Sequence, residues 1–103
     1  MSELDRIHRG TDWRYQIDVD YNSSAEVATF RLGTTAAKVA MSGTPDVTAT
    51  IAWGAYVAKH TIGTFALAKE VTAALIPGLY YFQIFSVGAD TTPLGDGTVQ
   101  VTL

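Results

Sequence analysis

The sequence predicts a single all-β domain made of short strands. Several of its nine glycines are about ten residues apart, which is the turn spacing of a β-sandwich or β-barrel. The segments between these turns alternate apolar and polar residues with a period of two, as strands with one buried face do. With 103 residues, of which 48% are hydrophobic, the chain has room for one core and for no second domain. We therefore expect residues 1–103 to form one β-sheet domain.

Three segments alternate strictly and are the clearest strands: 13–21, 47–53 and 98–103. In the first of them, apolar side chains at odd positions alternate with Arg14, Gln16, Asp18 and Asp20. Threonine supplies most of the polar positions in the other two, and its branched side chain suits a pleated strand. Weaker strands are expected at 27–32, 38–41 and 62–67.

Only one segment has helical spacing. Leu67, Val71 and Leu75 recur at every fourth position, and the proline of Pro77-Gly78 ends the pattern, so one or two helical turns are expected before it. Residues 88–93 are expected to form a hairpin loop between the last two strands. The glycines within 95–97 predict a bulge or a tight corner.

The segment from Leu75 to Tyr80, Leu-Ile-Pro-Gly-Leu-Tyr, resembles the tyrosine corner of immunoglobulin-like and fibronectin type III sandwiches. A buried tyrosine hydroxyl needs a hydrogen-bond partner, and the backbone just upstream of a tight corner supplies one. The predicted fold is therefore an immunoglobulin-like antiparallel β-sandwich of about seven short strands. One short helical turn precedes the corner formed by Pro77, Gly78 and Tyr80.

The strand after the corner is apolar on both faces. If Tyr80 points inward, so do Phe82 and Ile84, and the outer face then carries four apolar side chains: Leu79, Tyr81, Phe85 and Val87. In a two-layer sandwich one face of a strand usually meets water. Either a neighbouring loop or the short helix covers this outer face, or another protein chain does.

Composition excludes several classes of protein. Charged residues make up 17% of the chain, against about 25% in typical soluble domains, and ten of them lie in the first 31 positions. Seven scattered basic residues and a net charge of −3 argue against nucleic-acid binding. Without cysteine there is no disulfide framework and no thiol nucleophile. The uncharged run 71–89 contains Pro77-Gly78, which argues against a membrane span. The charged N-terminus predicts no signal peptide, and residues 1–10 are a candidate N-terminal arm.

No residue pattern points to an enzyme, a metal site or a cofactor. His8 and His60 lack the spacing of zinc ligands, and Asp18 and Asp20 lack the ligand spacing of a calcium loop. The segment 33–38 lacks the second glycine of a phosphate loop, and no serine lies in a nucleophile elbow. We therefore expect no catalytic residue, no metal and no cofactor.

A binding module is the alternative that the aromatic residues leave open. Trp53 and Tyr56 flank Gly54-Ala55 and are candidates for a sugar-stacking platform beside a turn. Trp13 would serve in the same way only if it lay outside the core. Aromatic residues at alternating strand positions are more often core residues. The residues expected in the core are Trp13, Tyr15, Ile17, Val19, Trp53, Tyr80, Phe82 and Ile84.

The order of these features resembles the immunoglobulin-like sandwich domains of tailed-bacteriophage virion proteins, among them N-terminal domains of baseplate and tail proteins. The features are Arg9-Gly10-Thr11-Asp12 before an aromatic strand, threonine- and alanine-rich central strands, and the helical turn that ends at Leu75. The segment 77–82 and a hairpin closing on 97–101 complete the order. The resemblance covers nearly the whole chain and brings no catalytic residues.

The resemblance implies a non-enzymatic structural protein of a virion, assembled in the host cytoplasm. Its expected partners are capsid, neck or tail subunits, bound in many copies or as a homo-oligomer, with neither nucleic acid nor membrane as a partner. The residues expected to contact the partner are Tyr81, Phe85, Leu79 and Val87 through apolar surface and Arg6, Arg9 and Arg14 through charge. The alternative function is a carbohydrate-binding or adhesion module displayed on the virion for host attachment.

Overall fold

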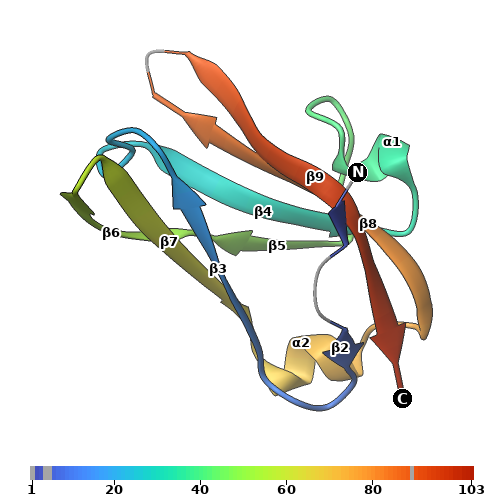
Figure 1. Ribbon diagram of the computed structural model, residues 1–103. Helices are drawn as coiled ribbons and strands as arrows, with labels where there is room; N and C mark the ends of the chain where they lie inside the picture. Colours follow the sequence, from blue (N-terminus) through green and yellow to red (C-terminus); the bar gives the residue numbers. More distant parts are fainter. Residues whose placement is uncertain (1, 4–5, 89) are drawn as a thin grey trace.

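Two β-sheets pack face to face in the computed structural model, which describes residues 2–3, 6–88 and 90–103 (Figure 1). The larger sheet has the order β1-β9-β8-β4-β5, with β2 also on β9, and the smaller has the order β3-β7-β6. The prediction of an all-β sandwich is confirmed. The strands are β1 (Ser2–Glu3), β2 (Ile7–His8), β3 (Trp13–Val19), β4 (Val27–Gly33), β5 (Val47–Thr50), β6 (Ala52–Val57), β7 (His60–Leu67), β8 (Gly78–Val87) and β9 (Thr91–Thr102). The helices are α1 (Ala36–Val39) and α2 (Lys69–Ala73).

The predicted helical turn is α2, while the strand predicted at 38–41 is wrong because α1 occupies this region. The side chain of Thr35 accepts a hydrogen bond of 3.3 Å from the Lys38 amide, which satisfies a donor that the first helical turn leaves free. Ala36 and Ala37 then favour helix over strand. Alternation over four residues was too short to distinguish the two.

Three boundaries differ from the prediction. The expected strand 47–53 divides at the buried Ile51, where the chain crosses from the larger sheet to the smaller one. Within the expected hairpin loop, β9 already begins at Thr91, and Ala89 lies outside the described residues. The bulge predicted at 95–97 falls one residue earlier, at Leu94, because Ile84 pairs with Gly95 and Phe85 with Pro93. Pro93 fits there because β1 and β2 reach β9 only at positions 97–98 and 101–102.

The segment expected as an N-terminal arm belongs to the larger sheet where it is described. Both β1 and β2 pair with β9 in parallel, so the sandwich is not purely antiparallel. Ile7 is fully buried and pairs with Val101, and the Arg9 amide donates a 2.9 Å hydrogen bond to the Thr102 carbonyl. Residues 7–9 thus belong to the edge of the sheet, and Ile7 to the core, instead of extending away from the domain.

Aromatic rings hold the two sheets together. Phe30 of β4 and Phe65 of β7 stack with ring centroids 4.6 Å apart, and Phe82 and Trp13 pack on Phe30 at 5.8 and 5.7 Å. Of the predicted core residues, Trp13, Tyr80, Phe82 and Ile84 are buried, and Tyr15, Ile17 and Trp53 pack against them while partly exposed. Val19, the eighth, is partly exposed at the end of β3.

Tyr80 forms the corner between α2 and β8. Its side chain is 4% exposed, and its hydroxyl oxygen accepts a 3.1 Å hydrogen bond from the amide of Ile76, four residues upstream. This is the backward bond that a tyrosine corner requires. Gly78, in between, has φ +142°, a conformation that disfavours a side chain.

Replacing Tyr80 with Phe is expected to lower the free energy of unfolding by about 1–3 kcal/mol, because the Ile76 amide loses its partner in a part-buried position. Urea unfolding followed by tryptophan fluorescence measures this change. Tyr56→Phe is the matched control, since that side chain is 43% exposed and its hydroxyl can bond to water. Equal stability of both variants and the parent would contradict the role of the corner.

Candidate protein-interaction site

The outer face of the larger sheet carries the four apolar residues predicted to meet a partner, Leu79, Tyr81, Phe85 and Val87. The alternation along β8 places Tyr80, Phe82 and Ile84 in the core and directs the odd-numbered side chains away from the smaller sheet. Leu79 and Val87 are 48% and 50% exposed, and Tyr81 and Phe85 are half-buried. The prediction that Tyr80, Phe82 and Ile84 face inward and that the odd-numbered residues of β8 face outward is therefore correct.

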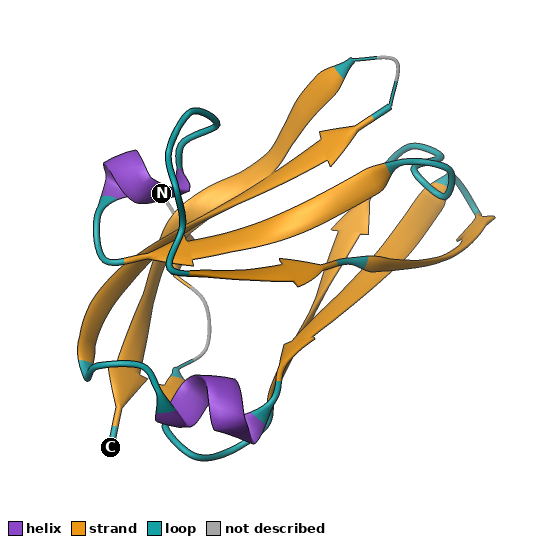
Figure 2. Cartoon of the chain, turned by 180° about the vertical axis from the view of Figure 1, so that it is seen from behind, coloured by secondary structure: helices purple, strands orange, loops and turns teal. Residues whose placement is uncertain are grey.

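The chain itself covers one end of this face. Gly33 is paired with Tyr81, and a Cβ atom at Gly33 would lie 2.9 Å from the Lys38 Cβ and 3.3 Å from the Val39 Cγ1. Val39 is 2% exposed but lies outside the core between the sheets, because it packs on this outer side. Helix α1 thus closely covers the sheet beside Tyr81. Figure 2 shows the loop after α1 passing over the same sheet before it enters β5.

Arg31 fixes this cover in place. Its guanidinium donates hydrogen bonds to three carbonyls of the covering segment, those of Val39 (3.1 Å), Ala40 (3.0 Å) and Gly43 (2.8 Å). Gln83 lies directly opposite Arg31 in the sheet, and its side-chain oxygen is buried. The loop and short-helix alternative therefore holds for Tyr81 and Gln83, although the helix involved is α1 and not the predicted one.

The other end of the face is open. Val27, directly opposite Val87 in the sheet, is 65% exposed, and Pro93, directly opposite Phe85, is also exposed. We call these four residues, Val27, Phe85, Val87 and Pro93, the open patch. It lies toward the tip of the β8–β9 hairpin, at the opposite end of the sheet from α1 (Figure 1).

A carboxylate holds the open patch in a defined shape. Glu26, next to Val27, accepts hydrogen bonds from the hydroxyls of Tyr21, at 2.8 Å, and of the fully buried Ser86. Burial of Tyr21, together with the Glu26 carboxylate beside it, raises the pKa of its hydroxyl. Since Ser86 belongs to β8, these bonds tie the start of β4 to the hairpin. The patch is thus formed before any partner arrives.

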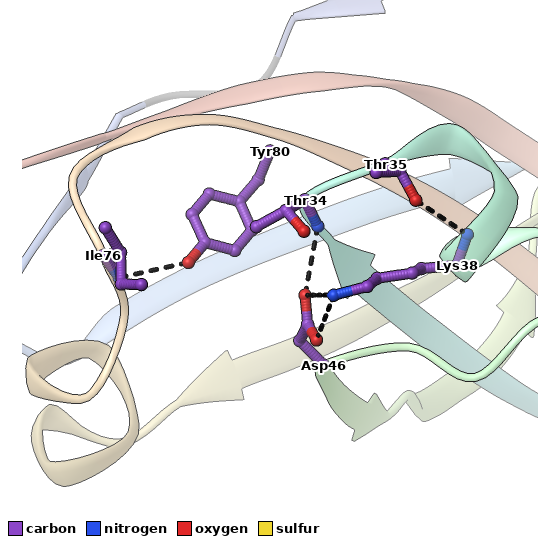
Figure 3. A network of polar contacts seen from close by, with 6 residues as sticks. All are labelled: Thr34, Thr35, Lys38, Asp46, Ile76 and Tyr80. Carbon is purple, nitrogen blue, oxygen red and sulfur yellow. Dashed lines mark hydrogen bonds and ion pairs between the residues drawn. The ribbon is translucent and has the colours of Figure 1, made fainter.

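A recess with a volume of about 660 Å³ lies beside the tyrosine corner. Tyr80, Leu75 and Val71 are among the residues that line it, and Lys38 and Asp46 form an ion pair of 2.9 Å at its rim. Figure 3 shows the Asp46 carboxylate between the Lys38 ammonium and the Thr34 amide, which donates to it at 3.1 Å. The ion pair ties the end of the covering loop back to α1.

The Lys38 ammonium, helped by the Thr34 amide, holds the pKa of the Asp46 carboxyl below its usual range. A carboxyl group whose pKa is lowered by folding stabilises the folded state above its unfolded pKa of about 3.8 and loses that effect as the pH falls through its folded pKa.

The three arginines predicted to bind acidic neighbours lie apart and differ in their contacts. Arg6 is exposed before β2, and Arg14 is exposed on the outer face of the smaller sheet, opposite Ala66. Arg9 instead donates a 2.8 Å hydrogen bond to the Ala73 carbonyl, at the end of α2. The structure therefore does not bring the arginines together into one basic surface.

The two residues of the candidate sugar platform, Trp53 and Tyr56, differ in burial. The ring of Trp53 lies over Gly63, since a Cβ there would meet its Cζ3 atom at 2.6 Å, and the side chain packs on the core. Tyr56 is exposed, but a bulge separates it from Trp53. Trp13 is only 6% exposed and belongs to the core. Trp53 and Tyr56 both belong to β6, and Tyr56 is the more exposed of the two.

Two of the residues considered as metal ligands, His60 and Asp18, lie next to each other. The His60 Nδ1 and the Asp18 Oδ1 lie 2.8 Å apart across β7 and β3, with both side chains about half exposed. Within residues 2–3, 6–88 and 90–103, no three His, Cys, Asp or Glu side chains are grouped to hold a metal ion. Over the same residues, no helix has the length and apolarity needed to cross a membrane.

Comparison with known proteins adds no family: no protein-family model matches the chain, and neither does any curated protein.

Val27, Pro93 and Arg31 were not predicted from the sequence as residues of this site. Inward Ala28, Phe30 and Leu32 imply by alternation that Val27 and Arg31 point outward, so the signal for their side of the sheet was present. The carbonyl partners of Arg31 lie 8 to 12 residues along the chain, in a loop with no periodic pattern.

Replacing Arg31 with Met is expected to release the covering loop, because three carbonyls lose a charged donor while the aliphatic stem remains. The amides of Ala40 and Gly43, which bond within this segment, should exchange with deuterium faster than in the parent. Arg14→Met, on an exposed strand face, is the control and should leave these rates unchanged. Unchanged exchange in both variants would show that the loop holds its place without Arg31.

Replacing Asp46 with Asn removes the acceptor charge of the ion pair without changing its shape. The parent should have the higher melting temperature at neutral pH, and the difference should shrink as the pH falls below about 3.8, where Asp46 itself becomes neutral. Thermal unfolding from pH 7 to pH 2 measures the difference. A difference that stays constant over this range would contradict the assignment to the Asp46 charge.

Proposed function

We propose that the protein is a non-enzymatic structural subunit of a tailed-bacteriophage virion, which binds and stabilises the capsid, neck or tail through protein–protein contacts. The observation that carries this proposal is the open patch. Four apolar residues lie side by side on three strands, β4, β8 and β9, outside the core between the sheets and away from the segment that covers the α1 end. Contiguous apolar surface of this kind marks interaction sites in proteins.

The contrast between the two ends of β8 supports a partner at the open end. At the α1 end, the chain uses a helix, a loop and an arginine to cover Tyr81 and Gln83. At the hairpin end, the face is equally apolar. The hydrogen bonds that Glu26 accepts hold the surrounding strands in place but do not cover this face. The predicted contacts of Phe85 and Val87 are kept in the proposal, with Val27 and Pro93 added to them. Tyr81 and Leu79 lie toward the covered end.

The resemblance of the chain to virion sandwich domains supplies the kind of partner. A domain that docks on a repeating surface stabilises that surface by mass action, because it binds the assembled state and not the separate subunits. Many equivalent copies multiply this effect. Exposed Arg6 and Arg14 are proposed to pair with acidic neighbours, whereas Arg9 is engaged with α2.

The variant Val27→Glu/Val87→Lys tests the patch without altering the net charge. The two positions face each other across β4 and β8, so the new side chains attract, and both parent residues are at least half exposed. The isolated domain should keep its melting temperature. The number of copies in purified phage particles, measured by mass spectrometry, should drop at least about tenfold because polar side chains replace the apolar contact.

The control variant is Ile76→Glu/Leu103→Lys, which makes the same two replacements at exposed apolar positions away from the patch. It should enter particles as the parent does. The proposal fails if the parent protein is missing from particles of the phage that encodes it. It fails equally if the patch variant enters them in parental number.

A further inference from the structure

Strand β6 forms an open edge of the smaller sheet. Among the described residues it is hydrogen-bonded to a neighbouring strand on one side only, where β7 lies. Its other side therefore presents backbone donors and acceptors that no strand of this chain pairs, and such an edge is a template for another strand. Figure 1 shows β6 at the margin of the fold, on the far side of β7 from β3.

Proteins protect such edges with charged residues, with proline or with β-bulges. From position 47 to position 58 the chain has no charged residue and no proline, and the bulge of β6 contains only the small residues Gly54 and Ala55. The other edge of the same sheet, β3, carries Arg14 and Asp18, and β9 of the larger sheet is partly covered by β1 and β2. The β6 edge instead exposes Tyr56 and Val57, at 43% and 66%.

The bulge in β6 makes the strand symmetric about its centre. Ala52 and Val57 pair with the outward-facing Thr64 and His60, while Trp53 and Tyr56 pair with the buried Gly63 and Thr61. Directly opposite residues share a face of a sheet. Ala52 and Val57 at the two ends of β6 therefore face outward, while Trp53 and Tyr56 on either side of the bulge face inward. A regular strand of six residues would begin and end on opposite faces.

From this symmetry we propose that two copies of the chain pair edge to edge through β6, antiparallel, about a two-fold axis at Gly54-Ala55. In this register Ala52 lies opposite Val57 of the second copy, and Trp53 lies opposite Tyr56, each on the matching face. Two-fold pairing brings the same surface of both copies together, which an uncharged strand allows without repulsion. The result is one continuous sheet of six strands.

The small residues at the bulge favour this arrangement. Gly54 and Ala55 lie at the axis, where the two backbones come closest, and neither carries a large side chain. Aromatic pairs across strands add stability to a sheet, and the register forms two of them, one on each side of the axis. At the end of β6, Ala58 and Lys59 have φ values of +51° and +66° and form a tight two-residue turn into β7.

This inference concerns a surface separate from the open patch and goes beyond the proposed function. Pairing through β6 leaves Val27, Phe85, Val87 and Pro93 free, because they belong to the other sheet. A dimer would thus offer two open patches to a virion surface. Either interaction can fail while the other holds.

Two charge variants at the same positions test the register. In Ala52→Lys/Val57→Lys, each new lysine faces a lysine of the second copy, whereas in Ala52→Glu/Val57→Lys each lysine faces a glutamate. Both positions are exposed on the outer face of the sheet, so the domain should fold in either case. Sedimentation equilibrium of the purified chain at about 100 μM measures the association, a concentration that populates complexes of micromolar affinity.

We expect the parent and the Glu/Lys variant to be dimers and the Lys/Lys variant to associate at least about tenfold more weakly. Hydrogen–deuterium exchange at high and low protein concentration should show protection on dimerisation within residues 52–57. A monomeric parent at about 100 μM overturns the proposal. So does equal association of the two variants, or protection that falls on residues 79–87 instead of on β6.

Discussion

The stacking of Phe30 on Phe65 is the contact on which the rest of the architecture depends. These two rings join the larger sheet to the smaller one at a centroid distance of 4.6 Å. Since a strand directs successive side chains to opposite faces, fixing Phe30 inward also fixes Arg31 outward, and pairing of β4 with β8 extends the same division to Phe82 and Gln83. The outer face of β8 is thus a consequence of how the core is packed, and the chain must either cover it or leave it for another molecule.

The sequence predicts the fold well where one strand's own pattern decides it. The alternation of β3 and of the last residues of β9 and the Pro77-Gly78 corner are local signals, and the structure agrees with them. The same alternation identifies the outward residues of β8. What covers them was not predictable, because α1 depends on a cap at Thr35 and on Arg31, whose partner carbonyls lie in a segment without periodicity. The bulge of β6 was missed for a similar reason: it is defined by pairing with β7 and leaves no mark in the sequence of β6 alone.

The two candidate surfaces rely on different chemistry. The open patch offers apolar side chains, so its selectivity for a partner comes from shape, which Glu26 and the hydrogen bonds it accepts keep constant. The edge of β6 offers backbone groups, which are the same in every protein, so its selectivity comes from symmetry and from the absence of charge. The low charge of the later two thirds of the chain serves both surfaces. Ten of the chain's 17 charged residues lie before position 32, and those that the structure shows as exposed are Arg6, Asp12, Arg14, Asp18 and Asp20.

The parallel pairing of β2 with β9 bears on how the chain acquires its structure. His8 and Thr102, whose side chains meet at 3.0 Å, are 94 residues apart, so this edge of the sheet cannot form on a ribosome until the last strand has emerged. Contacts between such distant residues require the closure of a long loop, and sheet proteins rich in them fold in about milliseconds to seconds, far more slowly than helical bundles. Until then Ile7 has no core to enter, and the edge of β8 that pairs with β9 stays open. The nascent chain therefore passes through a stage with an additional unprotected strand edge, which is when it is most prone to aggregate.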